Sequence, residues 1–252
     1  MTRTRTHRTL LVLLAAIAAV ALVAAGCSSD DDGSSSDTSE ATSETTAADD
    51  ATASGELVGT FGIDPGAFEG AEATGSYFRM VQSGGTVADG PFVPNADSTA
   101  SDQTYTLLEA GTDGGLVAGS FQPGPDPLFD ADGNALADAI IAPVTFFGVD
   151  FSILTAETDA EGGGSVEAVS ITDEDGTLSG QTTAVTAAYG GSEFNQGAPK
   201  PDGSTPGETT AVTGTYDPET GAYTLDWASQ IVGGSFDGFT GVWHLEGTFT
   251  AA

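Results

Sequence analysis

The sequence is poor in basic and sulfur-containing residues. Among 252 residues there are five Lys and Arg, two His and a single Cys, against 37 Asp and Glu, so the formal net charge is −32. A single cysteine excludes an internal disulfide and a metal site built from several cysteines. Two histidines are too few for a multi-histidine zinc site within one chain. Nucleic acids and other polyanions are excluded as partners, because binding them requires clustered Lys or Arg.

Motifs of the common enzyme classes are also missing. The chain contains no Gly-x-Ser-x-Gly nucleophile elbow and no His-Glu-x-x-His zinc motif. No glycine-rich loop follows a strand and opens a helix, so a phosphate cradle is not indicated. The 35 glycines instead punctuate turns between short segments. The surplus of acids favours solubility, accumulation of cations or life at high salt.

The N-terminal segment has the pattern of an export signal. Three arginines precede an unbroken apolar run, residues 10–25. The stretch 23–27, Val-Ala-Ala-Gly-Cys, resembles the lipobox of bacterial lipoproteins, with Ala24 where that family usually has Leu. The resemblance implies cleavage before Cys27, a diacylated Cys27 as the mature N-terminus, and a protein held by lipid on the outer face of a bacterial membrane. Residues 1–26 are therefore interpreted as a signal peptide.

A polar segment follows at once. Residues 27–55, after Cys27 itself, contain only Ser, Thr, Asp, Glu, Ala and Gly. Such a segment cannot bury enough apolar surface to offset the entropy lost on ordering. We interpret it as a disordered acidic tether that links the anchor to a domain formed by residues 56–252.

Residues 56–252 predict an all-β domain, an antiparallel sandwich or barrel with one short helix. Roughly nine to twelve short apolar or alternating runs are separated by Gly, Pro, Asn and Asp. Predicted strands cover 56–61, 76–82, 103–109, 115–122, 144–155, 165–171 and 176–189. A long loop is expected over 190–209, and the helix over 134–142, with Asp132 or Asn134 as its N-cap.

The C-terminal runs specify which residues face the core. Two alternating runs joined by Asp-Pro-Glu-Thr-Gly (217–221) predict a hairpin, and a third run covers 241–249. Because strand side chains alternate, Trp227 and Trp243 fall on the apolar faces of their strands. We therefore expect them in the core and not on a sugar-stacking surface. Residues 194–249 resemble secreted β-rich bacterial proteins of unassigned function, which implies a fold and a location but no activity.

Two groups of polar residues are candidate sites. Asp130, Asp132, Asn134 and Asp138 supply hard oxygens around Gly133, as a calcium loop does. Leu128 and Ala139 stand where an EF-hand would carry its first and last ligands, so a plain Asx turn is the alternative. No other cofactor is predicted.

The second group is Asp226, His244 and Glu246, on the polar faces of strands expected to be neighbours. A histidine with a neighbouring carboxylate can act as a general base. Polar residues on a solvated strand face have the same pattern. Three functions stay open: a non-catalytic module that binds a glycan, a small ligand or an envelope protein; a surface hydrolase using His244; and an acidic structural protein without a discrete site. A pocket with convergent titratable groups would favour the enzyme.

Overall fold

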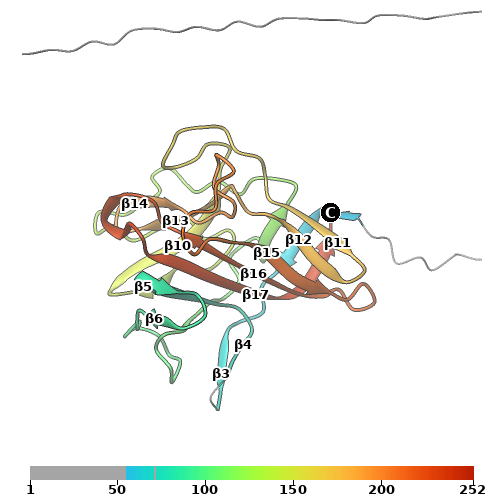
Figure 1. Cartoon of the computed structure of the whole chain (residues 1–252), viewed down its shortest axis with the longest axis horizontal. Helices are drawn as coiled ribbons and strands as arrows, with labels where there is room; N and C mark the ends of the chain where they lie inside the picture. Colours follow the sequence, from blue (N-terminus) through green and yellow to red (C-terminus); the bar gives the residue numbers. More distant parts are fainter. Residues whose placement is uncertain (1–54, 71) are drawn as a thin grey trace, which may run out of the picture. The chain divides into compact units, whose positions relative to one another are not determined.

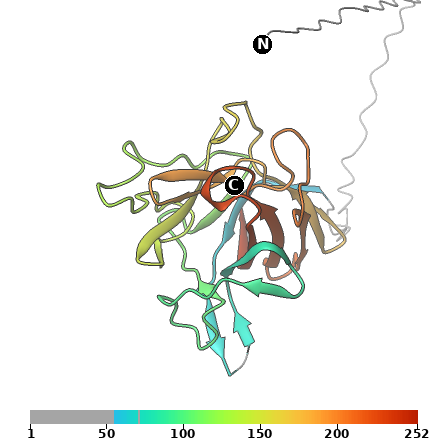
Figure 2. The ribbon, with the colours of Figure 1, turned by 60° about the vertical axis from the view of Figure 1, so that its left-hand side comes forward.

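The computed structural model describes residues 55–70 and 72–252, which form an antiparallel β structure. The predicted signal peptide, Cys27 and the predicted tether up to residue 54 lie outside the described residues, whereas Gly55, the last residue of the predicted tether, begins a strand. Within them, the only helical element is a 3-10 turn, η1 (Gly234–Phe236). The all-β prediction is confirmed, and the strands wrap around a common interior in a nearly closed, barrel-like arrangement (Figures 1 and 2).

The largest sheet has eleven strands. In order across its main path they are β1 (Gly55–Leu57), β11 (Ser170–Glu174), β12 (Thr177–Gln181), β15 (Thr210–Tyr216), β16 (Ala222–Gln230), β17 (Thr240–Ala251), β2 (Gly59–Gly62) and β8 (Gly115–Ala118). A branch from β17 adds β5 (Tyr77–Thr86), which also pairs with β6 (Gly90–Phe92) and β7 (Thr106–Leu107). β17 thus pairs with β16 along one edge and with both β5 and β2 along the other.

Two smaller sheets complete the structure. A four-stranded sheet has the order β14 (Ser192–Asn195), β13 (Val185–Tyr189), β10 (Val149–Thr155) and β9 (Val144–Phe146). The third is the hairpin β3 (Ala67–Glu69) and β4 (Glu72–Thr74), which projects from the other strands in both ribbon views (Figures 1 and 2).

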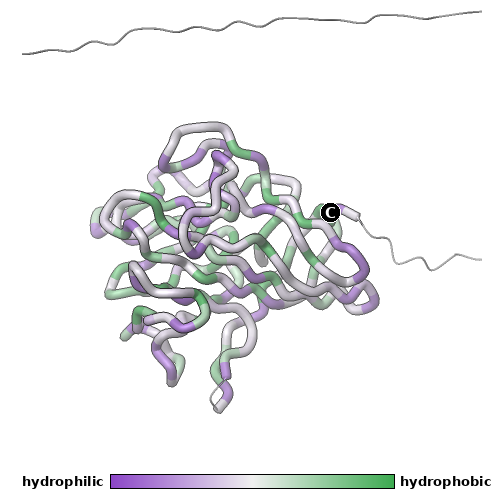
Figure 3. The backbone as a smooth tube through the Cα atoms, viewed as in Figure 1, coloured by the Kyte–Doolittle hydropathy of each residue, from purple (hydrophilic) through white to green (hydrophobic). Residues whose placement is uncertain are grey.

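The core lies between the large sheet and the four-stranded sheet. Trp243 of β17 and Phe78 of β5 belong to the same buried cluster as Phe151 and Ile153 of β10. The ring of Trp227 stacks on that of Trp243, with centroids 5.8 Å apart and an interplanar angle of 12°. The expectation that both tryptophans are core residues is confirmed. Hydrophobic residues recur along the strands with hydrophilic ones between them (Figure 3), as the alternation of strand side chains requires.

The predicted helix over 134–142 is wrong. Residues 135 and 141 form isolated β-bridges to Phe129 and Ala110. The carbonyls of residues 138–140 accept hydrogen bonds from the backbone N–H groups of residues 111–113. Pairing with a distant segment satisfies this backbone, and it overrides the helical propensity of an alanine-containing stretch.

Several predicted strand boundaries also differ. The run 56–61 is two strands separated by Val58, and 144–155 is the β9–β10 hairpin. Its turn residues Phe147 and Gly148 have φ of 50° and 75°, as a two-residue hairpin turn with positive φ at both positions requires. The loop predicted over 190–209 contains β14, which is an edge strand of the four-stranded sheet.

Candidate functional site

The polar face of β16 and β17 brings Asp226 and His244 together. The two residues lie directly opposite each other in the antiparallel register, one position from the buried Trp227–Trp243 pair. Alternation therefore sends the tryptophans into the core and Asp226 and His244 to the outer side. The prediction that the two residues lie on neighbouring strands is correct.

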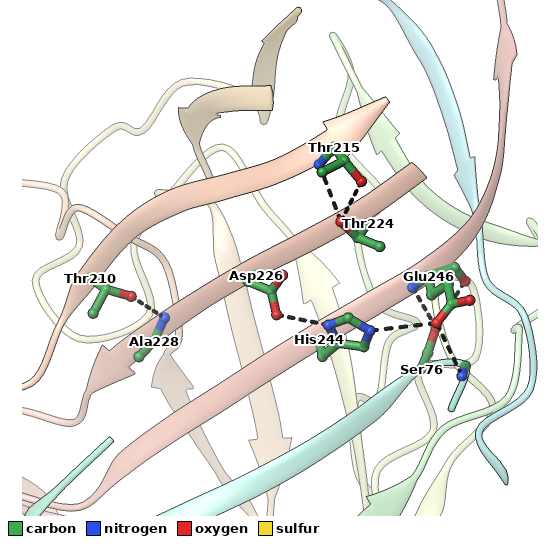
Figure 4. Close-up of polar contacts among 9 residues, drawn as sticks. Ser76, Thr210, Thr215, Thr224, Asp226, Ala228, His244 and Glu246 are labelled. Atoms are coloured by element: carbon green, nitrogen blue, oxygen red, sulfur yellow. Dashed lines mark hydrogen bonds and ion pairs between the residues drawn. The ribbon is translucent and has the colours of Figure 1, made fainter. Parts of the chain in front are cut away.

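His244 is held between two carboxylates. Its Nδ1 lies 2.7 Å from Oδ1 of Asp226, and its Nε2 lies 3.7 Å from Oε2 of Glu246 (Figure 4). The His244 side chain is 17% exposed, against 51% for Asp226 and 44% for Glu246. Burial disfavours the charged imidazole, but the hydrogen bond and charge of Asp226, followed by those of Glu246, outweigh it and raise the pKa of His244.

Aromatic rings extend this face across β5. The ring of Tyr77 stacks on His244, with centroids 4.7 Å apart and an interplanar angle of 22°. Tyr105 meets Tyr77 edge-on at 5.0 Å, and Phe68 of the projecting hairpin lies 5.5 Å from Tyr105. All three aromatic residues are partly exposed. Together with His244 they form a continuous row of rings.

Arg79 is the other basic group on this face. Its guanidinium carbon lies 3.3 Å from the ring centroid of Phe92 and 4.2 Å from that of Tyr105. Its Nη2 donates to Thr104 Oγ1 at 3.2 Å, and its buried Nε has no hydrogen-bond partner. After residue 27 the only Lys and Arg are Arg79 and Lys200, and Lys200 is buried. The partly exposed basic groups of the described chain, Arg79 and His244, are therefore on the same face.

A polar hollow of about 340 Å³ lies next to Glu246. Carboxylates and hydroxyls line it, contributed by Asp64, Asp217, Glu246, Thr215, Thr224 and Thr248. Thr215 and Thr224 face each other across β15 and β16, with their Oγ1 atoms 2.9 Å apart (Figure 4). We call the row of rings, the His244 cluster and this hollow the polar face.

Catalysis with His244 as a general base would need a nucleophile within hydrogen-bond reach of the imidazole. Both nitrogens of His244 face carboxylates, and no Ser, Thr or Cys hydrogen-bonds to the imidazole within 55–70 and 72–252. The nearby Ser76 hydroxyl exchanges hydrogen bonds with the backbone of Glu246 and is fully buried.

The predicted calcium residues form a turn around Asp130. Oδ1 of Asp130 accepts from the backbone N–H groups of Asp132 and Asn134, and Oδ2 accepts from the Asn134 side chain, each at 2.9 Å. These hydrogen bonds lower the pKa of Asp130, beginning with that from the Asn134 side chain. Asn134 Oδ1 in turn accepts from the N–H of Asp150. The geometry is that of an Asx turn.

Asp138, the fourth predicted calcium ligand, takes no part in these hydrogen bonds. Its backbone carbonyl accepts a hydrogen bond from the N–H of Thr112. Among the described residues, no group of three or more His, Cys, Asp or Glu side chains converges as a metal site would require. The calcium prediction stays a prediction.

Sequence reasoning missed a buried lysine. Lys200 is 5% exposed, and its Nζ donates to the carbonyl of Asn195 at 2.7 Å and to Ser229 Oγ at 2.8 Å. Burial lowers the pKa of Lys200 to about 8, although the charges of Glu161 and Asp159 oppose the shift. Ser229 donates to the Gly197 carbonyl and is fully buried, so the Lys–Ser pair is structural. Nothing in the local sequence around Lys200 signals this burial.

An apolar cavity between the two main sheets was missed as well. Its walls include Phe78, Phe146, Phe151, Phe236 and Trp243, which are spread over residues 78–243 of the sequence. Only the pairing of distant strands brings them together.

Comparisons with protein-family models, with curated proteins and with solved structures gave no match. Within the described part of the chain, no helix has the length and hydrophobicity needed to cross a membrane.

Proposed function

We propose that the chain is a lipid-anchored, non-catalytic binding module on the outer face of a bacterial membrane, and that its ligand is a neutral glycan. The lipobox-like sequence at residues 23–27 supports the anchor, and the polar segment after Cys27 gives the domain reach from the membrane. The observation that carries the choice of ligand is the His244 cluster. It stands on an outward sheet face, clamped by Asp226 and Glu246 and stacked on Tyr77.

The chemistry of the polar face matches that of a sugar. Carboxylates only accept hydrogen bonds when ionised, and sugar hydroxyls donate them. Threonine hydroxyls in the hollow both donate and accept, and partly exposed rings offer flat apolar surface to the C–H groups of a pyranose. The excess of acids around the face disfavours phosphorylated or sulfated ligands by repulsion.

Glycan binding by the purified Cys27→Ala protein tests the proposal. We expect saturable binding of at least one neutral oligosaccharide on a glycan array, confirmed by titration calorimetry. Tyr77→Ala and Asp226→Asn should each weaken it at least tenfold. Phe147→Ala is the matched aromatic control, because Phe147 is 54% exposed on the β9–β10 turn of the other sheet. Equal losses in Tyr77→Ala and Phe147→Ala, or no binding at all, would contradict the proposal.

The hydrolase alternative has one observation in its favour, the 2.7 Å contact between Asp226 and His244. In the same titrations, release of shorter sugars that stops in His244→Gln would favour it. If no ligand binds, the chain is better described as an acidic structural protein without a discrete site.

A further inference from the structure

The cavity between the large sheet and the four-stranded sheet is small and apolar. It has a volume of about 40 Å³ and lies on the inner side of β17, where Trp243 lines it, whereas His244 of the polar face is on the outer side of the same strand. Phe78 and Phe151 line it, together with two uncharged polar side chains, Gln196 and Tyr189, and the Tyr189 hydroxyl donates to Phe146 O at 3.0 Å. The Gln196 Oε1 accepts from Trp243 Nε1 at 3.1 Å, and its Nε2 donates to Asn195 O at 3.2 Å. No charged side chain lines the cavity, so it is suited to an uncharged ligand.

One wall of the cavity is not a strand. Phe236, in η1, contributes a ring that meets Tyr189 at 6.0 Å, Phe194 at 5.5 Å and Phe239 at 5.8 Å. These four rings are partly exposed. Phe236 therefore stands between solvent and the apolar interior.

The segment that carries Phe236, residues 232–238, contacts other strands through the Phe236 ring but forms no hydrogen bond to them in the described chain. Its hydrogen bonds in the described chain are internal or reach the adjoining residues: Gly233 N to Asp237 Oδ1, Gly238 N to Ile231 O, and Phe239 N to Phe236 O. Glycines with positive φ stand at positions 233, 234 and 238. Moving this segment outward breaks ring contacts but no hydrogen bond to another strand.

We propose that residues 232–238 form a lid over a binding site for a small uncharged aromatic molecule. When the lid moves out, the space of the Phe236 ring joins the existing cavity. The site then accepts a group of about the size and shape of a phenyl ring, because such a ring fills that space in the closed state. The ligand packs edge-on among Phe78, Phe146 and Phe151, as the Phe236 ring packs against its own neighbours. This site is independent of the proposed glycan surface, which lies on the other side of β17.

Binding of 4-fluorotoluene to the Cys27→Ala protein, followed by fluorine NMR, tests the proposal. We expect saturable binding with a dissociation constant in the millimolar range or tighter. Ala187, a partly buried residue of β13, lines the cavity. Ala187→Leu should fill the space and weaken binding at least tenfold, while oligosaccharide binding stays unchanged. Ala187→Val is the milder variant for use where Ala187→Leu does not fold, and it should weaken binding in the same direction.

The Phe236→Ala variant distinguishes between two roles of Phe236, a movable lid and a fixed core residue. If Phe236 is a lid, both the wild-type protein and Phe236→Ala bind the probe, the variant more tightly. Probe binding to Phe236→Ala alone would show that the ring is a permanent part of the core and would overturn the proposal. Absence of binding to both proteins would overturn it as well, as would probe binding unaffected by both Ala187 variants.

Discussion

At the scale of single residues, the stacked tryptophans give the sharpest stability prediction. Trp243→Ala removes a fully buried indole that stacks on Trp227 and donates to Gln196. We expect a loss of about 3–5 kcal/mol in the free energy of unfolding, the usual range for truncation of a buried aromatic residue. Urea denaturation measures it. Val242→Ala, one position away and partly exposed on the outer face, is the control and should cost less than about 1.5 kcal/mol. A larger loss of unfolding free energy in Val242→Ala than in Trp243→Ala would place the tryptophans on the outer face of the sheet.

Lys200 should make stability depend on alkaline pH. Its pKa is about 8 in the folded protein and 10.5 without burial, so between these values the unfolded chain holds a proton that the folded protein lacks. Stability therefore rises with pH across this window. Relative to Lys200→Met, the wild-type protein should gain on the order of 3 kcal/mol between pH 8 and 10.5. Denaturation of both proteins at a series of pH values measures the difference, and a flat difference would show that Lys200 titrates normally.

Residue patterns predicted part of the candidate site. Alternation alone placed Asp226 and His244 on one face, since the 222–230 and 240–251 strands are adjacent in the chain and pair directly. The stacking of Tyr77 on His244 could not be predicted, because it depends on β5 pairing with β17 across more than 160 residues. The same holds for Lys200, whose hydrogen-bond acceptors come from two other strands.

At the scale of elements, two substitutions in the 130–134 turn distinguish its structural role from metal binding. Asp130→Ala should lower the melting temperature without any metal, because it removes the acceptor of three hydrogen bonds. If the loop binds calcium, millimolar calcium should also raise the melting temperature by linkage, and Asp132→Ala should abolish only this increment. Thermal melts at matched ionic strength with magnesium and with sodium are the controls. An equal rise of the melting temperature in all three salts would indicate an Asx turn without a calcium site.

Element boundaries show where sequence patterns stop being informative. Strong alternation located β15, β16 and β17 to within a few residues, because these strands have one buried and one exposed face. The 134–142 stretch has buried alanines and isoleucines and pairs through isolated bridges, so the spacing of its apolar residues does not distinguish it from a helix. Likewise β14 is an edge strand of four residues, too short for alternation to reveal.

At the scale of the whole molecule, Cys27 should determine where the protein is found. We expect Cys27→Ala to yield protein that is released into the medium or keeps its signal peptide, because the acceptor of the lipid is gone. Partitioning into the detergent phase of a Triton X-114 separation measures the change. Ser28→Ala, next to the cysteine, is the control and should partition as the wild-type protein does. Unchanged partitioning of Cys27→Ala would contradict the lipoprotein interpretation.

The position of β17 also has a consequence for how the domain folds. It follows every other described strand in the chain, yet it lies between β16 on one side and β5 and β2 on the other. Until it is in place, three partner strands keep unpaired edges, and open strand edges are templates for aggregation. Contacts between segments so far apart in sequence make folding slow. A nascent chain that has not yet reached residue 240 should therefore depend on a holding chaperone, because the strand that joins its early and late halves does not yet exist.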